Sequence, residues 1–387
     1  MKYSTDRILT THVGSLPRPP DLTKLLMLED QGAAVDQNEL LAHVTKAVTE
    51  TVTRQVELGI DVVSDGEMSK MSYHIYAKHR LTGLENRPAK GIPGRPTPRD
   101  LKEFPEIVAE RGQKTLATSR LQAVVCSAEV GYADHAPLNH DITNLAAAVE
   151  KAGAVDAFMN SASPGVLVNY VPNKFYDDDD AYRDALVAAM RSEYEAIHAA
   201  GFVLQLDCPD LAGSRHTDQQ DMSDKEFLDR AQKSVDALNE ATANIPGEAM
   251  RLHICWLNYP GPHTHDIPVS KLIDLLSRAR PQALLFEGAN SRHDHEWEDW
   301  ASARIPDDKV LVPGVIDSTS NFVEHPRLIA QRICRYADIV GRERVIAGSD
   351  CGFGTYAGTP QVYPSIVNAK LAALAEGAMI ASEILWN

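Results

Sequence analysis

The chain contains 387 residues, of which 44% are hydrophobic, so it can bury one large core or two smaller ones. Its 54 acidic and 38 basic residues give a net charge of -16, and a field of that sign repels nucleic acids and anionic membrane surfaces. The sequence shows no cationic leader followed by an apolar core, and no run of about 20 apolar residues. We therefore expect a cytoplasmic protein that acts on small molecules and binds neither nucleic acid nor a membrane. The oligomeric state stays open at this point.

Short apolar runs alternate with longer helical patterns along the chain, as in proteins built from βαβ units. One helical pattern carries apolar residues at spacings of three and four, which form one stripe: Leu41, Val44, Val48, Val52 and Val56. Eight runs are typical of strands: residues 9–13, 61–64, 155–160, 202–207, 251–255, 283–287, 310–315 and 344–349. Eight parallel strands separated by helices predict one α/β domain over residues 1–387, folded as a (β/α)8 TIM barrel.

One segment after the second predicted strand does not fit the alternation. Residues 87–99, RPAKGIPGRPTPR, are rich in proline and glycine, and a ninth apolar run follows at 121–126. We therefore assign residues 85–130 to an excursion from the barrel, either a hairpin or a lid.

Residue types that suit zinc occur at the ends of three predicted strands. His253 and Cys255 end the strand RLHIC, and residues two apart in a strand point to the same face. Glu287 ends the strand ALLFE, and Cys351 directly follows the last strand. The carboxyl ends of barrel strands converge on one mouth, where the active sites of this fold lie. Imidazole, thiolate and carboxylate groups gathered there predict a zinc site.

Two simpler interpretations stay open beside the zinc site. A lone His-x-Cys pair in an apolar strand is more often structural, and histidines in two loops compete as ligands: His263, His265, His293 and His295. Five cysteines in a chain of this length argue against a disulfide framework. Cys126 and Cys334 occur in apolar patterns, and we expect both to be core residues.

At these residues the sequence resembles a known family, the cobalamin-independent methionine synthases. The likeness is to their catalytic carboxyl-terminal barrel and to the short single-barrel proteins related to it, and it extends over nearly the whole chain. It is carried by TTHVGSLPRP at 10–19, LGIDVVSDGEMSK at 58–70, LQLDCPDL at 204–211, LHICWLNYPGP at 252–262, LLFEGANSR at 284–292, VPGVIDSTS at 312–320 and VIAGSDCGFGT at 345–355.

The resemblance implies roles for particular residues. It implies a zinc ion held by His253, Cys255, Glu287 and Cys351, which agrees with the interpretation from strand ends, with Glu287 as the ligand that loosens when a substrate thiol arrives. It also implies that Ser15, Glu67 and Asp207 bind an amino-acid thiol. Ser15 would contact the carboxylate of that substrate, and the two acids would contact its ammonium group. The alternatives are a turn residue for Ser15, a helix-start acid for Glu67 and a strand-end cap for Asp207.

Departures from the synthase pattern leave the substrates open. Thr319 stands where the family has a histidine that assists the leaving group, and Tyr170 stands where the synthases tend to use tryptophan against a pterin ring. Short relatives that resemble this chain include epoxyalkane:coenzyme M transferases, in which a zinc-bound thiolate opens an epoxide. For that reaction His12, at the end of the first strand, is a candidate proton donor, and a backbone-bonded structural histidine is the alternative. A sulfonated thiol would need a cation, for which Arg18 and Arg292 are candidates.

The sequence thus predicts a zinc-dependent alkyltransferase. Its partners would be a small thiol, either homocysteine or a coenzyme M-like compound, and an alkyl donor. A second class stays open, because the barrel also resembles uroporphyrinogen decarboxylases, which work without zinc. A metal-free lyase or a non-catalytic ligand-binding barrel is therefore the alternative.

Overall fold

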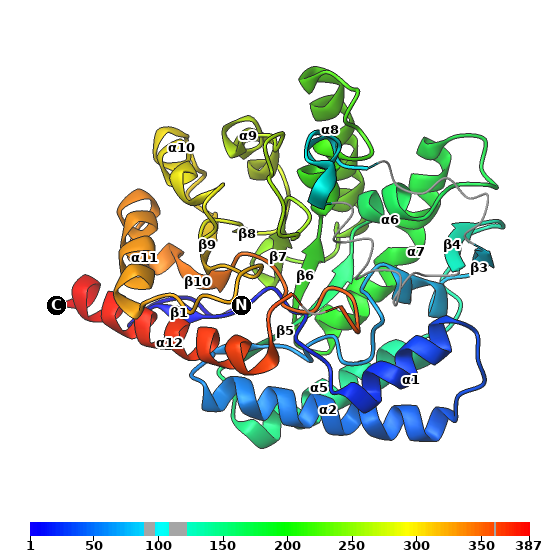
Figure 1. Cartoon of the computed structure of the whole chain (residues 1–387), viewed down its shortest axis with the longest axis horizontal. Coiled ribbons are helices and arrows are strands. Elements are labelled where there is room, and N and C mark those ends of the chain that lie inside the picture. The colour runs from blue at the N-terminus through cyan, green and yellow to red at the C-terminus, as the bar shows by residue number, and fades with distance from the viewer. Residues whose placement is uncertain (89–96, 108–121, 360) are drawn as a thin grey trace.

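A barrel of eight parallel strands is the main feature of the computed structural model, which describes residues 1–88, 97–107, 122–359 and 361–387 (Figure 1). The strands are β1 (Leu9–Thr10), β2 (Val62–Val63), β5 (Asp156–Ala162), β6 (Val203–Asp207), β7 (Met250–His253), β8 (Ala283–Phe286), β9 (Val310–Ile316) and β10 (Ile346–Ser349). They pair in the order β1-β10-β9-β8-β7-β6-β5-β2, and a parallel bridge between Thr11 and Val62 joins the two ends. The predicted (β/α)8 TIM barrel is confirmed, and each of the eight predicted runs overlaps an observed strand.

Helices surround the barrel, as Figure 1 shows for α2, α5, α7, α8, α11 and α12. The helices of the described chain are α1 (Pro20–Asp30), α2 (Gln37–Glu57), α3 (Arg99–Glu103), α5 (Ala136–Ala152), α6 (Pro164–Tyr170), α7 (Asp179–Ala199), α8 (Asp224–Ala241), α9 (Ile273–Ser277), α10 (Trp297–Ser302), α11 (Pro326–Val340) and α12 (Pro364–Trp386). Short 3-10 segments interrupt the loops, at η1 (Ile75–His79), η2 (Pro209–Leu211), η3 (Gly213–His216), η4 (Gly247–Ala249), η5 (Val269–Lys271), η6 (Asp294–Glu296) and η7 (Arg342–Arg344).

The sequence of helix α2 determines where the helix begins and which of its sides is buried. The Asp36 side chain caps its first turn by accepting from the backbone N–H groups of Asn38 and Glu39. Val44, Val48 and Val52 are buried, as the predicted stripe requires. Leu41, however, is 40% exposed, and Leu40 occupies the buried position instead. The predicted stripe was therefore wrong at one residue, because a shift of one position turns a side chain by about 100° around the helix.

The segment after β2 leaves the barrel. Strand β3 (Leu84–Pro88) pairs antiparallel with β4 (Gln122–Cys126), so the two strands form a separate two-stranded sheet. Residues 89–96 and 108–121 of the expected excursion lie outside the described residues. Ser127 N donates to Gly83 O (2.9 Å), which extends the contact between the two strands. Lys174 N donates to Cys126 O (2.9 Å), which holds this sheet against the loop between α6 and α7.

The barrel interior is mostly apolar, with one buried cation. Leu9, Leu285 and Val312 belong to a cluster within the ring of strands. Arg251, which is 1% exposed, donates to Gln205 Oε1 (2.7 Å) and to His12 O (2.8 Å), and its guanidinium lies 3.4 Å from the centre of the Phe158 ring. Burial lowers the pKa of Arg251 to about 9. Hydrogen bonds thus satisfy the buried guanidinium group of Arg251.

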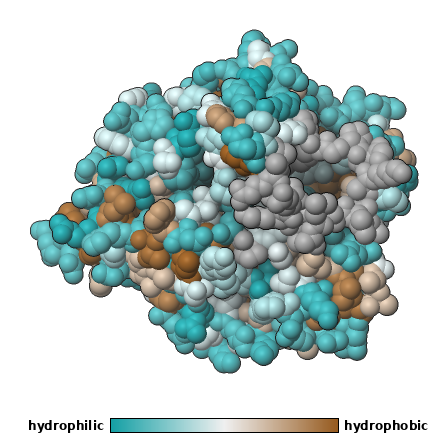
Figure 2. Space-filling model, in the orientation of Figure 1, coloured by the Kyte–Doolittle hydropathy of each residue, from teal (hydrophilic) through white to brown (hydrophobic). Residues whose placement is uncertain are grey.

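One face of the molecule is mostly hydrophilic. Figure 2 shows teal residues over most of this face, with brown patches at the left, over the region of α11 and α12, and others toward the lower right. The most exposed large apolar side chains are Phe322 and Tyr363, at 83% and 67%. Within the described part of the chain, no helix combines the length and apolar character that a membrane crossing requires.

Candidate metal centre

Three ligand-type side chains converge at the barrel mouth. His253 is the last residue of β7, Cys255 follows it by two residues, and Cys351 follows the end of β10 by two. One ligand atom of each residue lies within 4.8 Å of the others. All three residues are buried, at 4% to 5% exposure. Strand ends that are distant in sequence therefore place one imidazole and two thiols around a single point.

A carboxylate holds the imidazole of His253 in one orientation. His253 Nδ1 donates to Asp207 Oδ1 (3.0 Å), and Asp207 is the register partner of His253 across strands β6 and β7. Burial lowers the pKa of His253, but the bond to Asp207 and the nearby Cys255 outweigh that effect and raise it. His253 Nε2 is buried and has no hydrogen-bond partner among the described residues. A bonded Nδ1 and a bare Nε2 are the arrangement of a metal-ligating histidine with its supporting carboxylate.

The two thiols also favour a cation. The hydrogen bond to Cys255 and burial both raise the pKa of Cys351 well above its usual value. Two adjacent buried thiols therefore do not both ionise unless a positive charge joins them. One nitrogen and two sulfur donors are a set that zinc prefers over magnesium or calcium. The residues present thus fit a zinc ion.

Glu287, the fourth predicted ligand, lies beside this group but not within it. It follows the last residue of β8, Phe286, and is 6% exposed. Its Oε1 accepts from Trp256 N (2.8 Å), and its Oε2 accepts from Asn290 Nδ2 (2.8 Å). Both carboxylate oxygens therefore already have protein partners in this structure.

Asp350 fixes the loop that carries Glu287. Its carboxylate accepts from the backbone N–H groups of Gly288, Ala289 and Asn290, each at 2.8 Å. Burial raises the pKa of Asp350 to about 7, as do the negative charges of Glu287 and Asp317. Because Asp350 precedes Cys351, the same turn positions both proposed ligands.

A pocket of about 210 Å³ opens next to the thiols and contains the predicted substrate residues. Ser15, Glu67, Tyr170 and Asp207 all line it. Glu67 Oε1 accepts from Asn160 Nδ2 (2.7 Å), whereas Oε2 lies 3.5 Å from Arg18 Nη2 and has no hydrogen bond among the described residues. Burial raises the pKa of Glu67 to about 7, against the lowering effect of Lys70 and Arg18. Glu67 therefore offers an oxygen that can accept from a ligand.

Asp207 differs from Glu67, because its oxygens are already used. Oδ1 accepts from His253 Nδ1 and also from Gln205 Nε2 (2.8 Å), and Oδ2 accepts from Asn160 Nδ2 (3.0 Å). Gln205 in turn accepts from Arg251. The hydrogen bonds connect Asp207 to the metal group more directly than to the pocket.

Backbone strain gathers at the same pocket. Among the described residues, four that are not glycine have a positive φ, and Glu67 (59°), Leu257 (79°) and Asn258 (43°) of these line the pocket. Such conformations cost about 1 to 3 kcal/mol each and persist where surrounding contacts impose them. Asn258 Nδ2 donates to Gly352 O (2.8 Å), and Ser318 Oγ donates to Asn258 Oδ1 (2.7 Å). Asn258 thus ties three barrel loops together.

Two other predicted residues, His12 and Thr319, do not line the pocket. His12 is 1% exposed, its Nε2 lies 2.7 Å from Gln55 Oε1, and its Nδ1 accepts from Gly14 N (3.1 Å). Burial lowers the pKa of His12 to about 4, so the ring is neutral. The Thr319 hydroxyl donates to Asp317 in its own loop (2.8 Å). Both ring nitrogens of His12 therefore have partners, one of them a backbone N–H group, as in the structural alternative.

A second histidine group lies nearby and contains no cysteine. His263 Nδ1 and His293 Nε2 both donate to Asp266 Oδ2 (2.8 and 3.2 Å), and His216 Nδ1 lies 3.1 Å from Asp266 Oδ1. Burial raises the pKa of Asp266, but the three imidazoles outweigh it and hold the pKa below its usual range. His265 bonds to Glu103 (2.7 Å), and His295 is exposed. None of the four candidate loop histidines belongs to the group of close ligand atoms around the thiols, although His293 Nε2 lies 4.0 Å from Glu287 Oε2.

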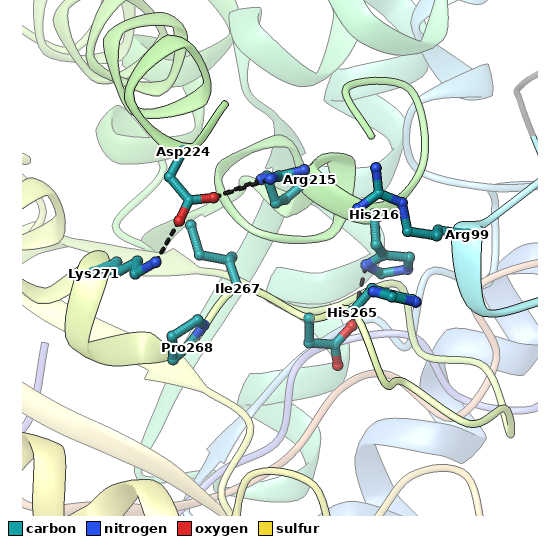
Figure 3. A pocket seen from close by; sticks show the side chains of 9 residues that line it. Arg99, Arg215, His216, Asp224, His265, Ile267, Pro268 and Lys271 are labelled. Atoms are coloured by element: carbon teal, nitrogen blue, oxygen red, sulfur yellow. Dashed lines mark hydrogen bonds and ion pairs between the residues drawn. The ribbon is translucent and has the colours of Figure 1, made fainter. Parts of the chain in front are cut away.

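Figure 3 shows the small pocket beside this second group. Arg215 and Lys271 approach Asp224 from two sides there, and His216, His265 and Arg99 lie at the other end. Arg215 Nη2 bonds to Asp224 Oδ1 at 3.0 Å. Asp224 is therefore paired with two of the cations that line this pocket, Arg215 and Lys271.

The remaining cysteines lie apart from the metal group. Cys126 is fully buried and Cys334 packs against the core, as predicted. Cys208, between Asp207 and Pro209, is buried and its Sγ points to Leu206 O (3.6 Å). No second cluster of ligand atoms with metal-binding spacing occurs in the described ranges.

Sequence reasoning missed several residues of the pocket. Tyr73, His74, Tyr259 and Tyr356 line it, and the His74 ring meets Tyr170 edge-on at 5.0 Å. Tyr259 lies within the motif WLNYPGP, Tyr356 directly follows SDCGFGT, and Tyr73 and His74 come a few residues after DGEMSK. Their position beside strand ends was the available signal, but nothing in one sequence distinguishes a pocket tyrosine from a packed one.

Fold and site together define a TIM-barrel protein with a buried imidazole and thiol group at the carboxyl ends of its strands. The chain matches the family described as cobalamin-independent synthase, catalytic domain, over residues 8–89 and 168–374. It belongs to that family, which supports placing it among the transferases.

Individual relatives are distant. An uncharacterized Bacillus subtilis protein, YxjH, is 23% identical over 357 residues, covering 89% of this chain and 86% of the relative. A methionine synthase from Sulfolobus acidocaldarius is 22% identical over 350 residues, covering 89% and 85%. The structure of a B12-independent methionine synthase from Shewanella sp. W3-18-1 in complex with selenomethionine superposes with a TM-score of 0.72 at 17% identity, covering 98% of this chain and 99% of that one. At that identity the structural likeness shows the fold alone.

Proposed function

We propose that this chain is a zinc-dependent alkyltransferase that activates a small amino-acid thiol and alkylates its sulfur. The observation that carries the proposal is the group of His253, Cys255 and Cys351, whose ligand atoms lie within 4.8 Å of one another. The bare Nε2 of His253 also supports a metal ion, because without one this buried nitrogen has no partner among the described residues. Membership of the synthase family supports the same chemistry.

His253, Cys255, Glu287 and Cys351 would hold the zinc. When bound, zinc supplies Lewis acidity that lowers the pKa of a coordinating thiol, so that the sulfur reacts as a thiolate at neutral pH. Glu287 is the weakest of these four ligands, because a carboxylate suits zinc less well than a thiolate. The structure shows a second set of partners for Glu287, Trp256 N and Asn290 Nδ2, which can accommodate its carboxylate when another donor takes its place.

Glu67 and Ser15 would position the amino-acid end of the thiol. Glu67 Oε2 has no hydrogen bond within the described residues, and a substrate ammonium group would supply one with an opposite charge. Ser15 lines the same pocket, and a side chain on Gly352 would collide with its hydroxyl, so glycine at 352 keeps Ser15 in place. Asp207 contributes by orienting His253 and by sharing the Asn160 amide with Glu67.

The structure favours an amino-acid thiol over a sulfonated one. Arg18 donates to the backbone carbonyls of Leu16, Gly354 and Lys70, and its remaining contact is with Glu67. Arg292 is exposed and does not line the pocket. Neither guanidinium is therefore placed to receive a sulfonate beside the thiol.

Calorimetry with homocysteine and with coenzyme M tests the proposal. The protein is purified without chelators, its zinc is measured, and each thiol is titrated into it. We expect about one zinc per chain and tighter binding of homocysteine than of coenzyme M. Protein that contains no zinc and takes up none would contradict the whole proposal, whereas preference for coenzyme M would contradict only the assignment of the thiol.

A further inference from the structure

The pocket that contains the two thiols is lined by several aromatic side chains. Tyr73, Tyr170, Tyr259 and Tyr356 line the pocket, which is four of the 12 tyrosines in the chain. His74 packs among three of them, with ring centres 5.2 Å from Tyr73, 5.0 Å from Tyr170 and 5.8 Å from Tyr356. An alkyl donor that reaches the sulfur must therefore lie against tyrosine rings.

The charge of the pocket has one sign. Its described lining includes the carboxylates of Glu67 and Asp207 and no lysine or arginine. Two buried cations lie behind this lining. Lys70 Nζ donates to Asn160 O (3.1 Å), and Arg18 donates to backbone carbonyls while its Nη2 lies 3.5 Å from Glu67 Oε2. The whole chain adds a net charge of -16. Tyrosine faces attract an organic cation, and a pocket lined by carboxylates within an acidic chain repels an anionic donor.

The leaving group gives an independent argument. A neutral donor such as an epoxide, or a methyl group on a neutral amine, leaves as an anion that needs a proton. The candidate donor His12 has partners on both ring nitrogens, and the hydroxyl of Thr319, which stands where the family has a histidine, donates to Asp317. A donor that already carries a positive charge at the leaving atom needs no proton.

We propose that the alkyl donor is a small onium compound, a methyl sulfonium or a quaternary methylammonium, seated against the tyrosine wall. This inference rests on the proposed function, because it presumes a thiolate at the metal group. In the transfer step a sulfur lone pair forms the new carbon–sulfur bond. The bond from the methyl carbon to the onium atom breaks, and its electron pair stays on that atom. The leaving group departs as a neutral sulfide or tertiary amine, so no proton, oxidant or reductant is required.

A pair of unreactive probes tests the recognition without turnover. Choline and 3,3-dimethylbutan-1-ol have the same shape, but only choline is charged, and each is titrated into the zinc-loaded protein by calorimetry. We expect choline to bind at least about tenfold more tightly, which is the contribution of a desolvated cation–π contact. Equal binding of the neutral probe would overturn the inference.

Variants of the tyrosine wall locate the effect. Tyr170→Leu and Tyr356→Leu remove a ring and keep an apolar side chain, so we expect the preference for choline to fall about threefold to tenfold in each. Tyr170→Phe keeps the ring and should keep most of the preference, and Tyr363→Leu, at an exposed site outside the pocket, should keep all of it. Zinc content and homocysteine affinity report whether each variant is folded. An unchanged preference in both leucine variants would contradict the placement of the cation.

Turnover with a cationic donor completes the test. Trimethylsulfonium and homocysteine should yield methionine and dimethyl sulfide in equal amounts, at a rate well above that with 5-methyltetrahydrofolate. If homocysteine binds but only the folate donor reacts, the onium inference fails and the proposed function stands. If neither zinc nor homocysteine binds, the proposed function itself fails.

Discussion

Buried histidines occur in two places in this barrel, around Asp266 and at the barrel mouth, and their surroundings differ. Around Asp266, both ring nitrogens of His263 and of His293 are bonded, to Asp266 and to Tyr259 O or Glu296. The third member, His216, approaches Asp266 Oδ1 with Nδ1 (3.1 Å), and its Nε2 has no hydrogen-bond partner among the described residues. At the barrel mouth, His253 has one bonded nitrogen and one bare one, and two thiols face it. The first group shares the carboxylate of Asp266. The second group brings an imidazole and two thiols together, a set of donors that fits a metal ion.

The largest expected effect comes from removing a thiol of the second group. Cys255→Ser or Cys351→Ser should lower zinc content more than about tenfold and abolish alkyl transfer, because a hydroxyl is a much poorer zinc ligand than a thiolate. Plasma emission measurement of zinc per chain checks this, with Cys334→Ser as the matched control that keeps its metal. Full zinc content in both ligand variants would remove the distinction between the two groups.

Asp266→Asn tests the first group from the other side. It removes the charge that three imidazoles share, so we expect a loss of about 3 to 5 kcal/mol in the free energy of unfolding. Zinc content should stay at the wild-type level in protein kept folded at low temperature. Chemical denaturation gives the first value and metal analysis the second. A loss of zinc without a loss of stability would make the Asp266 group part of the metal site.

Asp207→Asn should produce a smaller change at the second group. The amide replaces the carboxylate that orients His253, and such supporting partners typically contribute about tenfold or more to metal affinity. Competition with a chelator of known zinc affinity measures the change. The family resemblance instead implies that Asp207 binds the ammonium group of the substrate. Unchanged zinc affinity together with weakened homocysteine binding would favour that role.

Glu67 extends the comparison from metal to substrate. Glu67→Gln should leave zinc in place and weaken homocysteine about tenfold, because it removes a charge-assisted hydrogen bond to the ammonium group. The matched control is 4-mercaptobutyrate, which is homocysteine without its amino group and should bind both proteins alike. Calorimetry with the two thiols measures both terms. An equal loss for both thiols would indicate that the variant damages the pocket rather than the ammonium contact.

The smallest expected effect is a pH dependence of homocysteine affinity, which also arises from the carboxylate of Glu67. Because the pKa of Glu67 is raised to about 7, the side chain gains its charge as pH rises through neutrality. The ratio of homocysteine affinity to 4-mercaptobutyrate affinity should therefore increase between about pH 6 and pH 8, and the comparison cancels the ionisation of the thiol itself. In Glu67→Gln the ratio should be flat, and a rise that persists there would assign the titration to another group.

The sequence indicated the strands and the metal group because both depend on local patterns. Apolar runs mark buried parallel strands, and residues at strand ends of a barrel converge whatever the exact twist. Strand β7 ends two residues earlier than predicted, so Cys255 lies in the loop that follows it, whereas β10 ends at Ser349 as predicted and Cys351 lies in the next loop. The convergence was predicted because it tolerates such shifts.

The sequence could not indicate which partner each polar group takes. The bond between Asp207 and His253 depends on the register of β6 against β7, and the partner of His12 is Gln55 on α2. His263 and His293 looked like equal candidates for ligands until the fold placed Asp266 between them. Such pairings follow from tertiary contacts, which local periodicity does not encode.

Zinc K-edge X-ray absorption of the zinc-loaded protein, with and without homocysteine, tests the central claim most directly. The spectrum of the protein alone should fit two sulfur ligands, from Cys255 and Cys351, together with nitrogen or oxygen neighbours. Addition of homocysteine should raise the number of sulfur ligands by one. A zinc ion without sulfur ligands, or a sulfur count that homocysteine leaves unchanged, would contradict thiol activation at this site.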